Sequence, residues 1–318
     1  MTVATHGNCL DGLASATLFT HLIRKVEPDV NDIRYRTCIY GPTPVPFGPQ
    51  FLDGDLNAIL DYRFYSGPEL TWYFDHHVTA FSNDSQEGVF RSRAATGRYH
   101  LDPKSASCAG LIGRVSKQQF GLSLGHLESL VEYADQVDAA QYRSAAEALD
   151  RSAPRARFLA VVERFGSDEF IQHTVELLLQ MPLEDVAELP ETAQAFVEIE
   201  HEQTDFLDHV RDCSDDRGSV VVSDICDREH PSFAKFANYL LFPRSTYSVL
   251  LGRIPGALKI ALGFNPWGTM ARRHDLGSIC RQFGGGGHPV VGGVAFAPED
   301  TSGARSVLRE IVAILEHT

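Results

Sequence analysis

Residues 70–77 read Leu70-Thr71-Trp72-Tyr73-Phe74-Asp75-His76-His77, an apolar run that ends in one acid and two imidazoles. Such a run is typical of a buried strand, and α/β proteins bind ligands at the carboxyl ends of their strands. Imidazole nitrogens are common metal ligands, and an adjacent carboxylate can orient them. The stretch therefore predicts a functional site at a strand end, with a polar surface loop as the alternative.

Strand and helix patterns alternate on both sides of this stretch. The strand patterns lie at 2–5, 33–40, 58–60 and 71–74, and the helix patterns at 12–26, 105–117 and 123–133. Alternation of this kind indicates an α/β fold, in which a mostly parallel sheet has helices on both faces. We expect such a domain over residues 1–152.

The rest of the chain has a different organisation. Helical periodicity dominates residues 153–208, so we expect a helical linker over 153–215. Strand patterns follow at 219–223, 247–253, 258–264 and 293–296, with helix patterns at 233–241, 276–283 and 304–315. These predict a smaller C-terminal α/β domain over 216–318.

Composition limits the classes of partner. The chain has 318 residues and a net charge of −14, from 28 basic and 42 acidic residues. Tight binding to long duplex nucleic acid needs many phosphate contacts, so we expect no such partner. A bound metal can invert the local field, so a small phosphorylated substrate or a short single-stranded oligonucleotide remains compatible with this charge.

The cysteines and the apolar runs point to a compartment. Six cysteines are scattered without a CxxC pair, as expected for reduced thiols. No apolar run approaches the ~20 residues of a membrane span, and no signal peptide precedes the first candidate residue. We expect a cytoplasmic protein with no membrane partner, and the sequence leaves a homodimer open.

Further candidate ligands stand at strand and helix ends. The junction over residues 6–12, HGNCLDG, offers His6, Cys9 and Asp11 as metal ligands, or else a glycine-rich turn with an aspartate that caps the helix. Asp61 ends another strand. Asp135 and Asp138 follow a helix, and we expect only one of them to be functional.

Oxygen and imidazole ligands with little thiolate suit Mn²⁺, Mg²⁺, Fe²⁺ or Co²⁺ better than a structural zinc. Enough acids are present for one carboxylate to bridge two ions ~3.5–4 Å apart.

A glycine run marks the C-terminal domain. Residues 283–289 read FGGGGHP, between a helix pattern and a strand pattern. Successive exposed N–H groups would form an anion-binding nest, whereas a flexible linker is the alternative. Nearby, Arg272-Arg273 either meets substrate phosphates or starts a solvated helix. Trp267 either stacks on a base or belongs to a plain turn.

The motif order resembles that of the DHH phosphoesterase superfamily, whose smaller domain carries a GGGH motif. The residues that carry the resemblance are His6, Asp11-Gly12, Asp61, Asp75-His76-His77, Asp138 and the run Gly284-Gly285-Gly286-Gly287-His288. The resemblance implies two lobes around a cleft, with one or two divalent ions in the first lobe. The ion would be Mn²⁺, with Mg²⁺ or another divalent metal as alternatives.

The resemblance also implies a role for each residue. Asp61 would bridge two ions, His6 would hold one ion, and Asp11, His76 and Asp138 would hold the other. His77 would contact the scissile phosphate, and Asp75 would orient the neighbouring imidazole. The residues expected to bind the substrate are Gly285, Gly286, Gly287, His288, Arg272 and Arg273.

The first motif departs from the family pattern. The family has two aspartates spaced D-x-D, whereas this chain has Cys9 in place of the first and Asp11 in place of the second. Thiolate is a soft ligand that disfavours Mn²⁺ and Mg²⁺. We therefore expect the His6 site to be weak, to take another metal, or to be empty.

We expect a divalent-metal-dependent phosphoesterase that hydrolyses small phosphate esters or short oligonucleotides. Two alternative functions stay open, beside a purely structural metal site. One is a catalytically weakened nucleotide-binding regulatory protein, suggested by Cys9. The other is an exopolyphosphatase-like hydrolase of phosphoanhydrides.

Overall fold

The computed structural model describes residues 1–39 and 45–317. The chain forms two compact units, which we describe one at a time. The first unit comprises Met1–Gln141 and Arg151–Phe196, and the second comprises Tyr142–Asp150 and Val197–Thr318. The chain therefore passes between the units three times.

A parallel sheet forms the centre of the first unit. Its described strands are β1 (Thr2–His6), β2 (Arg34–Cys38), β3 (Asn57–Leu60), β4 (Trp72–Asp75) and β5 (Tyr99–Leu101). They run in the order β2-β1-β3-β4-β5, and every pair is parallel. The predicted α/β class is confirmed, and the described sheet is wholly parallel.

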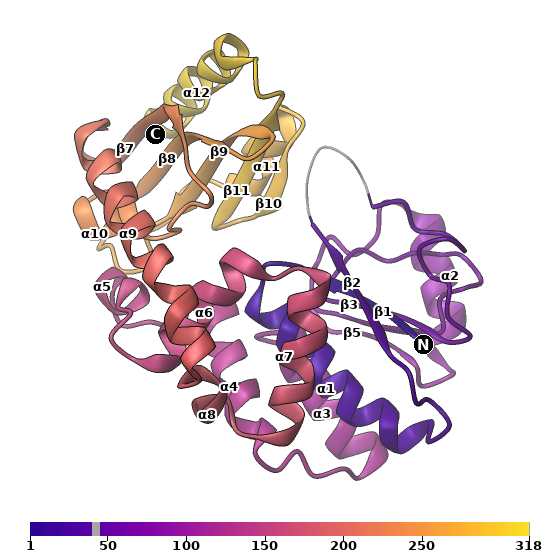
Figure 1. The fold of residues 1–318 in the computed structure, drawn as a ribbon. Coiled ribbons are helices and arrows are strands. Elements are labelled where there is room, and N and C mark those ends of the chain that lie inside the picture. Colours follow the sequence, from indigo (N-terminus) through magenta and orange to yellow (C-terminus); the bar gives the residue numbers. More distant parts are fainter. Residues whose placement is uncertain (40–44, 318) are drawn as a thin grey trace. The chain divides into compact units, whose positions relative to one another are not determined.

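Helices cover both faces of this sheet, which explains why its central strands are apolar throughout. The helices described here are α1 (Leu10–Val26), α2 (Asp84–Ala94), α3 (Cys108–Phe120), α4 (Leu127–Asp138), α6 (Pro154–Phe165), α7 (Asp168–Gln180) and α8 (Leu183–Ala187). In β4, Trp72 and Phe74 belong to the core formed with α1 and α3, whereas Tyr73 belongs to the core on the other face. Figure 1 shows α2 on one side of the sheet and α1, α3 and α7 on the other.

The helical middle of the chain packs into the first unit. Helices α6, α7 and α8 contribute Phe158, Ile171, Val175, Leu183 and others to the core shared with α1. Helix α9 (Pro190–Asp212) runs from the first unit into the second. The division at residues 152 and 215 stays a prediction, but these contacts group α6–α8 with the first unit.

Two elements of the first unit, α2 and β5, were not predicted from the sequence. Helix α2 has no buried residue, so it lacks an apolar stripe, and β5 has only three residues. Both lie between His77 and Ser105, in a segment without strong periodicity.

The second unit has a mixed sheet in the order β10-β11-β9-β8-β7-β6, in which only β7 and β8 pair in parallel among the described strands. Its strands are β6 (Ser214–Asp216), β7 (Val220–Glu229), β8 (Tyr247–Ile254), β9 (Ala257–Phe264), β10 (Gly286–His288) and β11 (Val291–Phe296). Its helices are α5 (Ala145–Leu149), α10 (Ala237–Leu241), α11 (Leu276–Gln282) and α12 (Thr301–Glu316).

Helices cover both faces of the second sheet as well. The α11 and α12 side chains form one core, while α9 and α10 pack on the other face. Among the described helices of either unit, none combines the length and apolar character needed to cross a membrane.

Candidate functional site

Three neighbouring strand ends bring chemistry to one edge of the parallel sheet. His6 is the last residue of β1, Asp61 follows β3, and Asp75 is the last residue of β4. The register pairs Thr5 with Leu60 and Leu60 with Phe74, so the three strand ends lie in a row. The polar residues at 75–77 therefore lie at the sheet edge where α/β proteins bind ligands.

Two helices complete the cluster. Asp11 lies in the first turn of α1, and Asp138 is the last residue of α4. The Nε2 atom of His76 lies 3.6 Å from Asp11 Oδ2, 3.6 Å from Asp61 Oδ1 and 3.3 Å from Asp138 Oδ2. The structure thus brings together four of the predicted ligands.

Helix α4 extends further than the pattern at 123–133 indicates, and this separates its two acids. Asp135 accepts a hydrogen bond from the hydroxyl of Ser107, the residue that caps α3. Asp138 lies one turn later and joins His76. Asp135 therefore supports α3, and Asp138 is the acid that reaches the site.

Metal-ligating atoms gather in three overlapping groups, within each of which they lie within 4.8 Å of one another. The groups are His6, Cys9 and Asp61; Asp61, His76 and His77; and Asp11, His76 and Asp138. Asp61 links the first two groups, since its Oδ2 lies 3.4 Å from His6 Nδ1 and its Oδ1 faces His76.

Two buried polar atoms in this cluster, Asp61 Oδ1 and His76 Nε2, have no hydrogen-bond partner among the described residues. The other ring nitrogen of His76, Nδ1, lies 3.1 Å from the carbonyl oxygen of Ser105. A carbonyl can only accept, so in the neutral ring Nδ1 carries the proton and Nε2 presents its lone pair. Unpartnered buried acceptors that converge in this way fit a divalent cation.

The electrostatics of the cluster also fit a cation. Burial, followed by the charge of Asp138, raises the pKa of Asp11 to about 6. Burial, followed by the charge of Asp11, holds the pKa of Asp61 well above its usual range. A bound cation would relieve this repulsion between buried carboxylates.

Asp75 faces inward and holds His77. Its Oδ1 lies 2.7 Å from His77 Nδ1, and its Oδ2 accepts a hydrogen bond of 2.9 Å from the hydroxyl of Tyr73. Burial alone would lower the pKa of His77, but the hydrogen bond and charge of Asp75 outweigh it, so the pKa is raised. The geometry is that of a carboxylate that orients an imidazole.

Sequence reasoning missed the backbone groups of the site. The N–H groups of Cys108 and Ala109 donate to Asp11 at 2.7 and 2.8 Å, and the carbonyl of Ser105 faces His76. A backbone group has no side-chain signature, so no sequence signal could have located these contacts. The Tyr73 hydroxyl was also missed, because it lies inside a strand that reads as apolar.

The glycine run of the second unit is only partly a loop. Residues 286–288 form β10, which pairs antiparallel with β11. The N–H groups of Gly284 and Gly285 donate to carbonyls of α11. The predicted row of exposed N–H groups is therefore wrong for these two glycines. At Gly287, φ is +146° and a Cβ would lie 2.2 Å from Val291 O, so packing alone requires glycine there.

The arginine pair divides into two environments. Arg272 donates hydrogen bonds to the carbonyls of His274 and Pro289, and so links the segment before α11 to the segment after β10. The side chain of Arg273 is exposed, while its backbone N–H donates to the Tyr247 hydroxyl. Roles for both arginines in substrate binding stay predictions.

No protein-family model matches the sequence, and a search of curated proteins finds no relative. Solved structures do match. A pGpG-specific phosphodiesterase, PggH from Vibrio cholerae, is 18% identical with a TM-score of 0.64, over 98% of this chain and 99% of that one. RecJ from Thermus thermophilus in complex with Mn²⁺ is 13% identical with a TM-score of 0.60, over 98% of this chain and 52% of that one.

An exopolyphosphatase-related protein from Bacteroides fragilis is 12% identical with a TM-score of 0.52, over 99% of this chain and 93% of that one. The chain has the fold of these solved structures, as the resemblance to the DHH superfamily predicts. The likeness extends over both units, because each alignment covers nearly all of the chain.

Within this fold, the residues Asp75, His76 and His77 differ in their contacts. Asp75 is buried and turned toward His77, whereas His76 points its Nε2 atom at the three other acids. Cys9, which stands where the DHH pattern has an acid, lies in the same group as His6 and Asp61.

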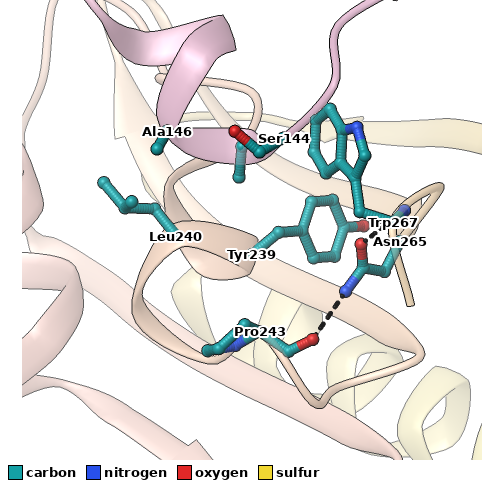
Figure 2. Close-up of a pocket in the computed structure, with 8 residues that line it drawn as sticks. Ser144, Ala146, Tyr239, Leu240, Pro243, Asn265 and Trp267 are labelled. Carbon is teal, nitrogen blue, oxygen red and sulfur yellow. Dashed lines mark hydrogen bonds between the residues drawn. The ribbon is translucent and has the colours of Figure 1, made fainter. Parts of the chain in front are cut away.

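The second unit of this fold also has a hollow of about 210 Å³, lined by Ser144, Ala145, Ala146, Tyr239, Leu240, Pro243, Asn265 and Trp267. Figure 2 shows Trp267 and Tyr239 side by side, and Asn265 reaching the carbonyl of Pro243. The indole N–H of Trp267 donates to the carbonyl of Tyr142 at 2.6 Å. The indole is therefore held in place, and base stacking stays a prediction.

Proposed function

We propose that the protein is a divalent-metal-dependent phosphoesterase that hydrolyses small phosphate esters or short oligonucleotides. One observation carries the proposal. Five acids and imidazoles from separate segments, His6, Asp11, Asp61, His76 and Asp138, converge at one sheet edge, where Asp61 Oδ1 and His76 Nε2 are buried without a hydrogen-bond partner in the described part of the chain.

The acids and imidazoles are the ligands proposed to hold the ion. Asp11, Asp61, His76 and Asp138 form an oxygen-rich set of the kind that Mn²⁺ and Mg²⁺ prefer. Structures of RecJ contain Mn²⁺ or Mg²⁺, which supports this choice. A bound divalent ion supplies Lewis-acid activation of water and neutralises charge on a phosphoryl group.

We assign His77 to the scissile phosphate. Asp75 holds its Nδ1, and the raised pKa of His77 favours the imidazolium form. Its Nε2 would then donate a charge-assisted hydrogen bond to a phosphoryl oxygen as negative charge develops there. The Tyr73 hydroxyl keeps Asp75 in position.

The substrate is proposed to be small and anionic. The net charge of −14 disfavours long duplexes, and the likeness to a pGpG-specific phosphodiesterase supports a short oligonucleotide. Residues 285–288, Arg272 and Arg273 are the proposed phosphate contacts in the second unit. The likeness to an exopolyphosphatase-related protein keeps inorganic polyphosphate as a second candidate.

The test is hydrolysis of bis-p-nitrophenyl phosphate by full-length protein with Mn²⁺ or after chelation. We expect Mn²⁺-stimulated hydrolysis that the double variant Asp75→Ala, His76→Ala reduces by ~100-fold or more. His173→Ala is the matched control, because His173 is exposed and pairs with Glu191 on the surface. Its activity should equal that of the wild type.

A screen then identifies the substrate class. It compares pGpG, 3′-phosphoadenosine 5′-phosphate, a cyclic dinucleotide and inorganic polyphosphate. Wild-type rates no higher than those of the double variant on every substrate would refute the enzyme and favour a nucleotide-binding regulatory protein.

A further inference from the structure

Cys9 lies among metal-ligating atoms, at a position where its own helix gives no reason for a cysteine. It is the N-cap of α1, with extended backbone angles, and its side chain makes no capping hydrogen bond. Asp, Asn, Ser or Thr would cap this helix better. Its thiol instead belongs to the group in which the ligand atoms of His6, Cys9 and Asp61 lie within 4.8 Å of one another.

We propose that His6, Cys9 and Asp61 form a mixed imidazole–thiolate–carboxylate site that selects a thiophilic divalent ion, Zn²⁺, Co²⁺ or Fe²⁺, over Mn²⁺ and Mg²⁺. The adjacent set of Asp11, His76 and Asp138 contains no sulfur and suits Mn²⁺ or Mg²⁺. The inference rests on the metal centre proposed above, and it makes that centre a pair of chemically different sites.

Asp61 is placed to serve both sites. Its Oδ2 lies 3.4 Å from His6 Nδ1, and its Oδ1, buried and without a hydrogen-bond partner among the described residues, lies 3.6 Å from His76 Nε2. Its backbone has φ of +55°, an unusual conformation for a non-glycine residue. Such conformations cluster at ligand sites, where the surrounding structure holds them in place.

The spacing is compatible with coordination by one ion. Ligand atoms around a four-coordinate Zn²⁺, at bond lengths of ~2.0–2.3 Å, lie roughly 3.5 Å apart. Atoms that already lie within 4.8 Å of one another need only small side-chain movements to reach this separation. Cys9 forms no disulfide, so its sulfur is chemically able to bind as thiolate.

The test uses Co²⁺ as the probe, because thiolate ligation gives a sulfur-to-cobalt charge-transfer band in the near ultraviolet. Full-length protein is stripped of metal and titrated with Co²⁺. We expect the band in the wild type, its loss in Cys9→Ser, and ~10-fold or more weaker Co²⁺ and Zn²⁺ binding in that variant. Cys213→Ser, a partly exposed cysteine of the second unit, is the matched control and should keep the band.

Cys9→Asp tests the selectivity. Replacing sulfur by oxygen should remove the band and strengthen Mn²⁺ binding at this site by ~10-fold or more, measured by calorimetry. X-ray absorption of the Zn²⁺-loaded wild type should show a sulfur shell at ~2.3 Å, a result that needs no variant to fold.

A wild type without the band and without a sulfur shell would overturn the inference, as would a Cys9→Ser protein that keeps both. Because these measurements do not use hydrolysis, they separate the two proposals. Active protein without thiolate ligation refutes only this site, and thiolate ligation without hydrolysis of any substrate refutes only the phosphoesterase.

Discussion

Asp61 combines three features that rarely occur in one residue. It is buried, its backbone is left-handed, and one carboxylate oxygen has no hydrogen-bond partner in the described structure. Burial and Asp11 hold its pKa well above the ordinary value of 3.8. Without metal, the folded chain therefore keeps the proton to a higher pH than the unfolded chain. The free energy of unfolding should fall as pH rises through that range.

Asp61→Asn should stabilise the metal-free protein while it weakens metal binding. Asparagine tolerates the left-handed backbone and carries no charge, so the free energy of unfolding at pH 7 should rise by about 1–2 kcal/mol. Urea unfolding in the presence of a chelator, repeated between pH 4 and pH 8, checks both the gain and the flatter pH dependence.

Asp53→Asn is the control, for which the change in the free energy of unfolding at pH 7 should have the opposite sign. The hydrogen bond from Thr2, together with Arg34 and Arg36, lowers the pKa of Asp53. That carboxylate therefore stabilises the fold above its unfolded pKa, and its contribution is lost as pH falls. An Asp61→Asn protein less stable than the wild type in chelator at pH 7 would refute this account of the buried charge.

At the residue scale, the sequence predicted which side chains form the candidate site, but not which backbone groups contact them. His6, Asp11, Asp61, His76 and Asp138 could be proposed because each stands at a strand or helix end, and the structure places their ligating atoms close together. The contacts of Asp11 with the start of α3 depend on where that helix begins, which was predicted three residues too early. Helix boundaries depend on caps, here the Ser107 side chain.

At the scale of elements, the packing of α1 against β1 positions two proposed ligands, Asp11 at the start of the helix and His6 at the end of the strand. Gly12 follows Asp11, and a Cβ on it would lie 2.0 Å from the carbonyl oxygen of His6. Helix α1 can therefore approach the end of β1 this closely only with glycine at that position.

Gly12→Ala should lower the free energy of unfolding by about 2–3 kcal/mol and weaken Mn²⁺ binding, because the helix must move away from His6. Gly88→Ala is the matched control in α2, where a Cβ would meet nothing within 4 Å. It should raise the free energy of unfolding by about 0.5–1 kcal/mol. Urea unfolding and Mn²⁺ calorimetry measure both, and effects of the same sign would contradict the steric argument.

Elements with a strong apolar pattern were predictable, and weakly patterned ones were not. The pattern at 71–74 located β4 within one residue, because both faces of that strand are buried. Helix α2 has no fully buried residue and packs on its core only through the partly buried Val89 and Phe90, so its apolar pattern is weak. The glycine run was predicted as a loop, but backbone pairing with β11 overrides the low strand propensity of glycine in β10.

At the scale of the whole molecule, all proposed metal ligands belong to the first unit, and each unit contains one of the two tryptophans. Trp72 lies in β4, and Trp267 belongs to the second unit. The variant Trp267→Phe therefore gives tryptophan fluorescence from the first unit alone. The variant Trp72→Phe gives it from the second unit alone.

Mn²⁺ should stabilise only the unit that binds it. At a hundredfold excess over its Kd, a ligand adds ~2.7 kcal/mol to the free energy of unfolding. The midpoint reported by Trp72 should rise with Mn²⁺ and return after chelation, while that reported by Trp267 should stay constant. Equal shifts of both midpoints would show that the units unfold together and would contradict this expectation.

The three passages of the chain between its units also limit how the protein can be taken apart. No single cut yields both units intact, because residues 142–150 belong with the second unit but lie inside the sequence of the first. A fragment that starts at Val197 would lack the carbonyl of Tyr142, which the Trp267 indole uses as its acceptor. Isolated recombinant halves are therefore incomplete substitutes for the parent protein, and a circularly permuted gene would have to preserve this short insertion.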